Sequence, residues 1–169
     1  MSSPATAFTD TGRSNDRERS LGYGYVRTIS DQLSDESQVM NAGVSGNRVI
    51  DLQRRWADDV YALEPGHISV LVGVNDTLRR YDSGDPTSVE NFEEIYREIL
   101  GSAHTPRPIL MEPFLLPISG EQEMWFEDLR PKQLAVQTLA EEFNAVFVHL
   151  QSMFDDAALA RGRSLQSAC

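Results

Sequence analysis

The feature that most constrains the fold is a run of β-branched and apolar residues from Ile68 to Val74. Its apolar residues are nearly continuous instead of alternating with polar ones, which is typical of a strand covered on both faces in a parallel sheet. Similar apolar runs occupy residues 108–116 and 145–150, and a shorter run over residues 38–43 ends in glycine. We therefore expect a buried strand at each of these positions.

Amphipathic patterns with helical spacing separate these apolar runs. They predict helices over residues 24–33, 49–63 and 87–101, and Ala135, Leu139 and Phe143 mark a fourth helix. Thr87 and Glu90 have the spacing of a capping box at the start of the third helix. This alternation of strands and helices predicts an α/β fold with a mostly parallel sheet and right-handed crossovers.

Size and charge exclude several classes of protein. The 169 residues suit one domain over 1–169, and 15 Lys and Arg against 26 Asp and Glu give a net charge of −11. Because positive charge is not clustered, we expect no nucleic-acid partner and no membrane partner.

Met1 to Ser20 lacks the apolar core of a signal peptide, so a cytoplasmic location is expected. The single cysteine, Cys169, argues against a disulfide framework and a Cys-rich zinc site.

Two loops that follow predicted strands are unusual in composition. Residues 41–47 read Asn-Ala-Gly-Val-Ser-Gly-Asn, and residues 73–77 read Gly-Val-Asn-Asp-Thr. Ligands of open parallel sheets bind beyond the carboxyl ends of the strands, where these loops are expected. Glycine lets a backbone N–H approach a ligand closely, and an asparagine amide donates to a developing negative charge. The two loops together could form an oxyanion site.

A purely structural interpretation of the same loops remains open. Gly43 and Gly46 could serve only a tight turn into the next helix, with Ser45 or Asn47 as its N-cap. The Asn-Asp pair at residues 75–76 could likewise be an Asx turn.

Both loops resemble signature blocks of one superfamily. Asn41–Gly46 and Gly73–Asp76 are similar to the second and third blocks of the SGNH hydrolases, also called GDSL esterases and lipases. Phe8–Arg13 and Leu21–Val26 resemble the segment after the first block, so the resemblance spans about residues 8–160. It implies a three-layer α/β/α sandwich with a flavodoxin-like sheet. It also implies a serine hydrolase that cleaves small-molecule esters or acetylated substrates without metal or cofactor.

Carried over by position, the resemblance assigns roles to individual residues. Gly46 supplies an oxyanion-hole N–H, and Asn75 supplies the oxyanion-hole amide. The nucleophile position, three residues before Asp10, is Ala7. Alanine has no hydroxyl, so covalent acyl transfer at that position is excluded. The first strand, which should precede this position, is not evident in the sequence. The neighbouring site residues are Thr9, Asp10, Ser45, Gly73 and Asp76.

The last block of the family, Asp-x-x-His, supplies the general base and is not found after Asp155-Asp156. Of the three histidines, His67 and His104 precede strands and so lie at the wrong end of the sheet. His149, near the carboxyl end of the last strand, is the one candidate for a substitute base, although a packing role is the commoner one. Ser45 is a poor nucleophile candidate because it lies in the turn that should supply a donor.

Other chemical groups carry weaker signals. The adjacent carboxylates 58–59, 141–142 and 155–156 project about 100° apart on a helix, so we expect solvated helix faces and no metal site. Trp125-Phe126 falls in a predicted loop over residues 119–126. This aromatic pair could contact substrate or could pin the loop onto the core.

The sequence supports two hypotheses about function. The first is an SGNH ester hydrolase that is truncated and catalytically impaired in this chain, since the family domain has about 200 residues. It has two possible origins, a gene-model fragment and a true pseudoenzyme. The second hypothesis is a non-catalytic module that binds a small ligand with the Gly46 and Asn75 donors. A phosphate-binding protein ranks last because no Gly-rich loop with Lys and Ser or Thr is present.

Overall fold

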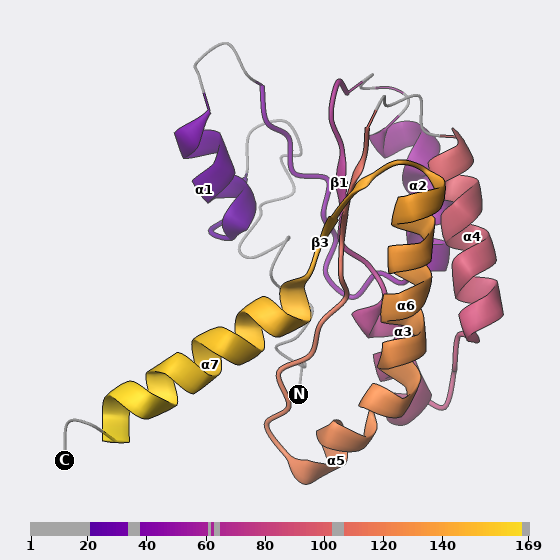
Figure 1. Cartoon of the computed structure of the whole chain (residues 1–169). Coiled ribbons are helices and arrows are strands. Elements are labelled where there is room, and N and C mark those ends of the chain that lie inside the picture. Colours follow the sequence, from indigo (N-terminus) through magenta and orange to yellow (C-terminus); the bar gives the residue numbers. More distant parts are fainter. Residues whose placement is uncertain (1–20, 34–37, 61, 63–64, 103–106, 167–169) are drawn as a thin grey trace. The chain divides into compact units, whose positions relative to one another are not determined.

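The computed structural model describes residues 21–33, 38–60, 62, 65–102 and 107–166 (Figure 1). The chain divides into two compact units, Met1–Asn47 and Arg48–Cys169, and each is described by itself. The single domain expected over residues 1–169 stays a prediction. No helix among the described residues is long and apolar enough to cross a membrane.

The first unit contains one described helix, α1 (Tyr25–Gln32), which confirms the helix predicted over residues 24–33. The strand predicted over residues 38–43 is wrong, because this segment has irregular backbone. Exposed and less exposed residues alternate along the segment, so the burial on both faces that the prediction assumed does not occur. A strand needs a ladder partner, and the described part of this unit contains no strand.

The second unit is built on a parallel sheet of three strands in the order β1-β2-β3. The strands are β1 (Ser69–Val70), β2 (Ile109–Met111) and β3 (Val146–Val148). Ser69 is paired with Ile109, and Ile109 is paired with Val146. The three longest predicted strands are thus confirmed in position and direction, although the regular ladders are shorter than the apolar runs.

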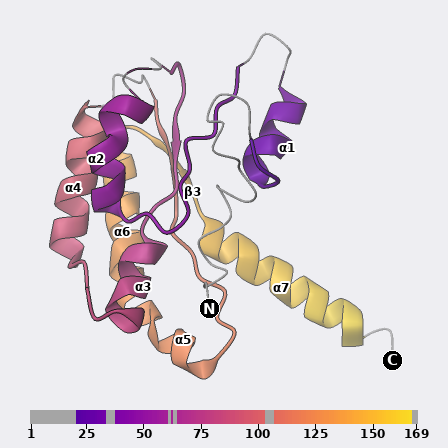
Figure 2. The same ribbon diagram turned by 180° about the vertical axis from the view of Figure 1, so that it is seen from behind.

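Six helices are described in this unit, and three of them lie together on one side of the sheet (Figures 1 and 2). The helices are α2 (Val49–Asp59), α3 (Val74–Asp82), α4 (Val89–Ser102), α5 (Gly120–Met124), α6 (Phe126–Glu142) and α7 (Leu150–Gln166). Helix α6 packs on β2 and β3, α4 packs on α6, and α2 packs on α4 (Figure 2).

The core lies between these helices and the sheet. It contains the predicted stripe of α4, which is buried at Phe92, Ile95, Tyr96, Ile99 and Leu100. Leu110 of β2 and Leu139 of α6 complete its centre and are fully buried. The helical spacing of apolar residues therefore identified the buried face correctly.

Helix boundaries differ from the predictions at two places. Helix α2 ends at Asp59, and Leu63, where it was expected to end, lies outside the described residues. The cap of α4 is Ser88, whose Oγ accepts a hydrogen bond from the Asn91 N–H at 3.2 Å. The capping role predicted for Thr87 is therefore wrong, because its side chain bonds to Asp76 instead.

Helix α7 leaves the body of its unit and extends away from the other helices of that unit (Figures 1 and 2). Its first turns are attached to the segment after β2. The Gln151 side chain bonds to both the N–H and the carbonyl of Leu115, each at 3.0 Å. The Phe154 ring stacks on Phe114 with centroids 4.3 Å apart. These contacts fix the direction in which the helix departs.

Candidate active site

The block at residues 73–77 begins a helix. Gly73 is the N-cap of α3, so Asn75 and Asp76 lie in the first helical turn, just beyond the carboxyl end of β1. The Asx turn considered for this pair is therefore wrong. The apolar run from Ile68 continues smoothly into the block, which hides the change from strand to helix. The expected location of Asn75 beyond β1 is correct, while its local structure is not.

Gly73 is required by both backbone and packing. Its φ of +128° is a conformation that residues with a side chain rarely adopt. A Cβ at this position would lie 3.1 Å from both the Phe92 ring and the Pro113 ring. The start of α3 is thus pressed against α4 and against the residues that follow β2.

Asp76 is fully buried and joins two helix starts. Its two carboxylate oxygens accept from the N–H of Val49, the first residue of α2, at 3.3 and 3.2 Å. The Thr87 side chain is also hydrogen-bonded to this carboxylate. Burial raises the pKa of Asp76 to about 6, against the lowering effects of these hydrogen bonds and of the Lys132 and Arg48 charges. Asp76 is therefore charged at neutral pH and gains a proton in mildly acidic solution.

Asn75 is almost fully buried beside Asp76, with 5% of its surface exposed. Its amide belongs to the first turn of α3, where the helix dipole favours negative charge. An amide at this place can donate to an oxyanion. Its role in an oxyanion hole remains a prediction.

The loop at residues 41–47 belongs to the first unit. Gly46 has a φ of +86°, and the Asn47 N–H donates to the Val44 carbonyl at 3.4 Å, so a turn is formed as expected. The Asn41 side chain organises the loop by donating to the Leu21 carbonyl at 3.0 Å and accepting from the Gly43 N–H at 2.9 Å. The oxyanion role of Gly46 stays a prediction.

The N-cap of the following helix α2 is Arg48, so the alternative that Ser45 or Asn47 caps it is wrong. The Asp51 carboxylate accepts from the Arg48 N–H at 3.0 Å. The predicted nucleophile position Ala7, its neighbours Thr9 and Asp10, and His104 all lie outside the described residues.

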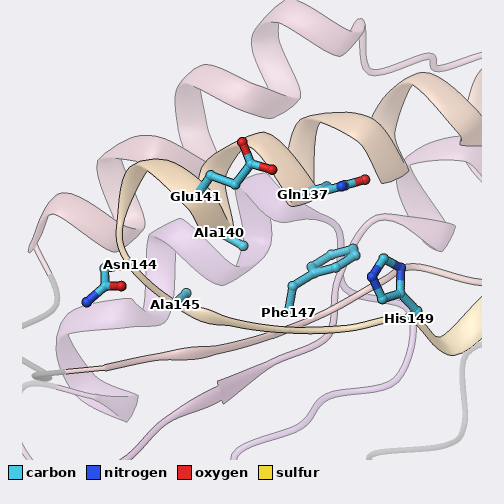
Figure 3. Close-up of a pocket in the computed structure, with 7 residues that line it drawn as sticks. All are labelled: Gln137, Ala140, Glu141, Asn144, Ala145, Phe147 and His149. Carbon is cyan, nitrogen blue, oxygen red and sulfur yellow. The ribbon is translucent and has the colours of Figure 1, made fainter.

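The two described histidines lie at opposite ends of the sheet. His67 is exposed and precedes β1, at the amino end, as predicted. His149 is exposed and follows β3, with its ring edge-on to Phe147 at a centroid distance of 4.6 Å. It lines a pocket of about 300 Å³ between α6 and β3 (Figure 3). The other lining residues are Gln137, Ala140, Glu141, Asn144, Ala145 and Phe147. A role of His149 as a base remains a prediction.

The aromatic pair at residues 125–126 lies at a helix junction. The predicted loop over residues 119–126 is wrong, because residues 120–124 form α5 and Phe126 begins α6. Trp125 stacks on Tyr81 of α3 with centroids 5.2 Å apart and planes 12° apart. Its indole N–H has no hydrogen-bond partner among the residues that the structure describes.

The carboxylate pairs behave differently from one another. Glu141-Glu142 and Asp155-Asp156 are exposed, as expected for solvated helix faces. The expectation is wrong for Asp59, which is buried and forms an ion pair with Arg55. Within the described ranges, no three His, Cys, Asp or Glu side chains gather into a group that could hold a metal ion.

Sequence patterns do not reveal a buried ion pair on α6. Lys132 is fully buried and pairs with Asp128, which also binds Arg80 of α3 at 3.2 Å. The spacing of four residues between Asp128 and Lys132 is a signal for an ion pair, but such pairs usually lie on an exposed helix face. Only tertiary packing places this pair beneath α3.

Comparisons with known proteins agree on one family. The model of the GDSL-like Lipase/Acylhydrolase family matches residues 8–167. An acetylxylan esterase from Geobacillus stearothermophilus is 32% identical over 165 residues, which are 89% of this chain and 75% of that protein.

Solved structures give the same result. A protein from Parabacteroides merdae, described as a possible GDSL-like lipase, superposes with a TM-score of 0.84 at 32% identity, covering 92% of this chain and 78% of its own. The structure of the Geobacillus stearothermophilus acetylxylan esterase has a TM-score of 0.79 at 29% identity, covering 90% of this chain and 76% of its own. These matches confirm the predicted α/β/α class with its parallel sheet. The chain belongs to the GDSL-like lipase/acylhydrolase family of ester hydrolases.

Proposed function

We propose that this chain carries the ester-recognition half of an acetyl-ester hydrolase, in which Asn75 and Gly46 hold the acyl oxygen of an acetylated carbohydrate. One observation carries the proposal: Asn75 is a buried amide in the first turn of a helix beyond the carboxyl end of a parallel strand. The glycine before this helix and the carboxylate after Asn75 restrict its backbone, so the donor is held in place before any ligand arrives.

The chemistry follows from this placement. When an ester is attacked, its carbonyl oxygen becomes an oxyanion, and a fixed donor stabilises that charge without reorganising. The Asn75 amide supports this role, and the positive end of α3 adds to it. Gly46 is assigned by its position in the family pattern, and it lies in a turn with a positive φ.

The substrate class is suggested by the relatives. Two similar structures are named as an acetyl-xylooligosaccharide esterase, and the curated relative is named as an acetylxylan esterase. An acetylated oligosaccharide is therefore the ligand that we propose for this chain. Trp125 and Phe126 are assigned as weaker substrate contacts, because an aromatic ring and an indole N–H suit a sugar face and a sugar hydroxyl.

Acyl transfer is a separate matter from ester recognition. In the relative, a serine, an aspartate and a histidine have each been replaced in variants described as catalytic mutants. Here the family pattern assigns the nucleophile position to Ala7, and it assigns the neighbouring site positions to Thr9, Asp10, Ser45, Gly73 and Asp76. We expect the chain as written to bind the ester without becoming acylated, as a non-catalytic binding module would.

The test compares acetylated xylobiose with unmodified xylobiose by titration calorimetry. The parent chain should prefer the acetylated sugar, and Asn75→Ala should lower that affinity about 3- to 10-fold, as expected for one lost hydrogen bond. Asn91→Ala, at an exposed position on α4, is the matched control and should change nothing. Equal affinity for both sugars would refute ester recognition.

A second measurement addresses acyl transfer. A fluorophosphonate probe should leave the parent chain unlabelled. Covalent labelling, together with p-nitrophenyl acetate hydrolysis that disappears in Asn75→Ala, would show that another residue acts as nucleophile and would overturn the expectation of binding without acylation.

A further inference from the structure

Strand β3 forms one edge of the sheet in the second unit. Among the strands that the structure describes, it pairs only with β2. The Val146 N–H donates to the Pro108 carbonyl at 2.9 Å, and the Val148 carbonyl accepts from the Glu112 N–H at 3.0 Å. The backbone groups of successive strand residues point to alternate sides, so the N–H and carbonyl of Phe147 point away from β2.

This edge carries neither charge nor proline, two features that discourage pairing with another chain. Residues 145–148 read Ala-Val-Phe-Val, and the register with β2 continues through the strand without a bulge. Val146 is 36% exposed, so solvent reaches the strand. The outer edge of β3 is therefore open to a further strand.

The side chains beside this edge follow a definite order. Residues 145, 147 and 149 share one face of β3, because side chains alternate along a strand, and all three line the pocket between α6 and β3 (Figure 3). The Ala145 N–H donates to the Ala140 carbonyl at 2.8 Å, which holds the end of α6 beside Ala145. Glu141 and the small Ala145 thus lie toward one end of the pocket, and the larger His149 ring lies at the other.

Glu141 and His149 are complementary groups that do not bind each other within one copy. Both residues are exposed. Glu142 forms an ion pair with Arg97 at 3.0 Å, whereas Glu141 forms none with the residues that the structure describes. The His149 ring is held edge-on to Phe147. Each copy therefore presents a carboxylate at one end of the edge and an imidazole at the other.

A twofold axis at Phe147 would bring these groups together. In an antiparallel pair of β3 strands centred on this residue, position 145 lies opposite position 149 of the second copy, and 146 lies opposite 148. The two Phe147 residues then exchange both N–H···O bonds. The Cβ atoms of His149 of the second copy and Ala145 come within about 5 Å, which leads the imidazole toward Glu141. Symmetry repeats the contact on the other side of the axis.

We infer that the outer edge of β3 is a self-association surface, on which two copies of this chain join their sheets across a twofold axis at Phe147, with Glu141 of each copy bound to His149 of the other. An unrelated extended peptide would also meet the backbone groups of this edge. Only a second copy supplies a histidine opposite Ala145 on both sides of the axis. The inference concerns assembly and does not depend on the proposed function.

The first test detects the dimer and locates it. Sedimentation velocity of the parent chain over a dilution series, with a reductant that keeps Cys169 from linking copies, should show a reversible dimer. By hydrogen exchange, the Phe147 amide should become protected as the dimer forms. The Val146 amide, already bonded to Pro108, should not change. A chain that stays monomeric up to about 1 mM, or a Phe147 amide already protected in the monomer, would overturn the inference.

The second test exchanges charges. Glu141→Lys places a lysine beside His149 of the second copy, and His149→Glu places two carboxylates together. Each should raise the Kd of the dimer about tenfold, because the contact occurs twice. The double variant restores opposite charges and should return the Kd toward the parent value. Glu94→Lys, at an exposed position on α4, is the matched control and should not weaken the dimer.

Glu141→Lys and Glu94→Lys change the net charge equally, so general repulsion between acidic chains cannot account for a difference between them. A Kd that Glu141→Lys leaves unchanged, or that the double variant fails to restore, would overturn the proposed register. If His149→Glu does not fold, because its ring packs on Phe147, the comparison of the two lysine variants and the Phe147 amide exchange still decide the matter.

Discussion

The packing around Gly73, the N-cap of α3, gives the most direct test of the structure. In Gly73→Ala, the new methyl group would lie 3.1 Å from atoms of both Phe92 and Pro113, in a backbone conformation with φ of +128°. The backbone conformation alone costs about 1–3 kcal/mol for a residue with a side chain. Crowding in a packed region adds about 1–3 kcal/mol. The sum is a loss of about 2–6 kcal/mol in the free energy of unfolding.

Gly84→Ala is the matched control. Gly84 also has a positive φ, +67°, but no atom lies within 4 Å of an added Cβ. It should therefore show the backbone cost alone, about 1–2 kcal/mol. The difference between the two variants reflects the crowding around Gly73 together with its less accessible backbone conformation.

The assay is urea unfolding followed by circular dichroism, with a thermal scan as a second readout. A loss of about 4 kcal/mol in a chain of this size lowers the Tm by about 8–16 °C. If Gly73→Ala loses no more stability than Gly84→Ala, the close packing of the α3 start against Phe92 and Pro113 is wrong.

Three further predictions concern the same unit. Burial raises the pKa of Asp76 from its ordinary 3.8 to about 6, so its charged form costs stability that grows between these two pH values and is complete above pH 6. Asp76→Asn should therefore stabilise the protein by up to about 3 kcal/mol near neutral pH, with the gain fading as the pH falls toward 3.8; an equal effect at both ends of this range would contradict the assignment. Phe154→Ala should lower the free energy of unfolding by about 1–3 kcal/mol and speed amide hydrogen exchange in α7. Met153 is largely exposed, so Met153→Ala should change the free energy of unfolding by less than about 0.5 kcal/mol. Equal exchange rates in the two variants would disprove the anchoring role of the stack between Phe154 and Phe114. Arg55→Met removes the ion pair between Arg55 and the buried Asp59 and should lower the free energy of unfolding, measured with urea, by about 1–3 kcal/mol. An unchanged free energy of unfolding would show that the pair is dispensable.

Part of the order of strands and helices could be predicted, because it depends on local patterns. The stripe from Phe92 to Leu100 repeats with the helical period, and that period alone identifies the face that α4 buries. The nearly continuous apolar run at Ile68 likewise predicted a strand of a parallel sheet, and β1 is paired in parallel with β2.

The predictions failed where a partner far along the chain decides the structure. Residues 38–43 have the composition of a strand but no ladder in the described residues. Thr87 has the spacing of a cap, yet its side chain bonds to Asp76, which lies on another helix. A local pattern cannot distinguish these outcomes, because the competing partner is absent from the local sequence.

The same division applies to the candidate site. Sequence alone identified the family resemblance, the location of Asn75 beyond a strand end and the alanine at the predicted nucleophile position. Each depends on residue identity and order, which the chain carries in itself. Tertiary structure decided that the block around Asn75 begins a helix, that Gly73 is confined by Phe92 and Pro113, and that Lys132 lies buried beside Asp128. Burial and charge compensation arise only when distant segments pack together, and they set the electrostatics of the site.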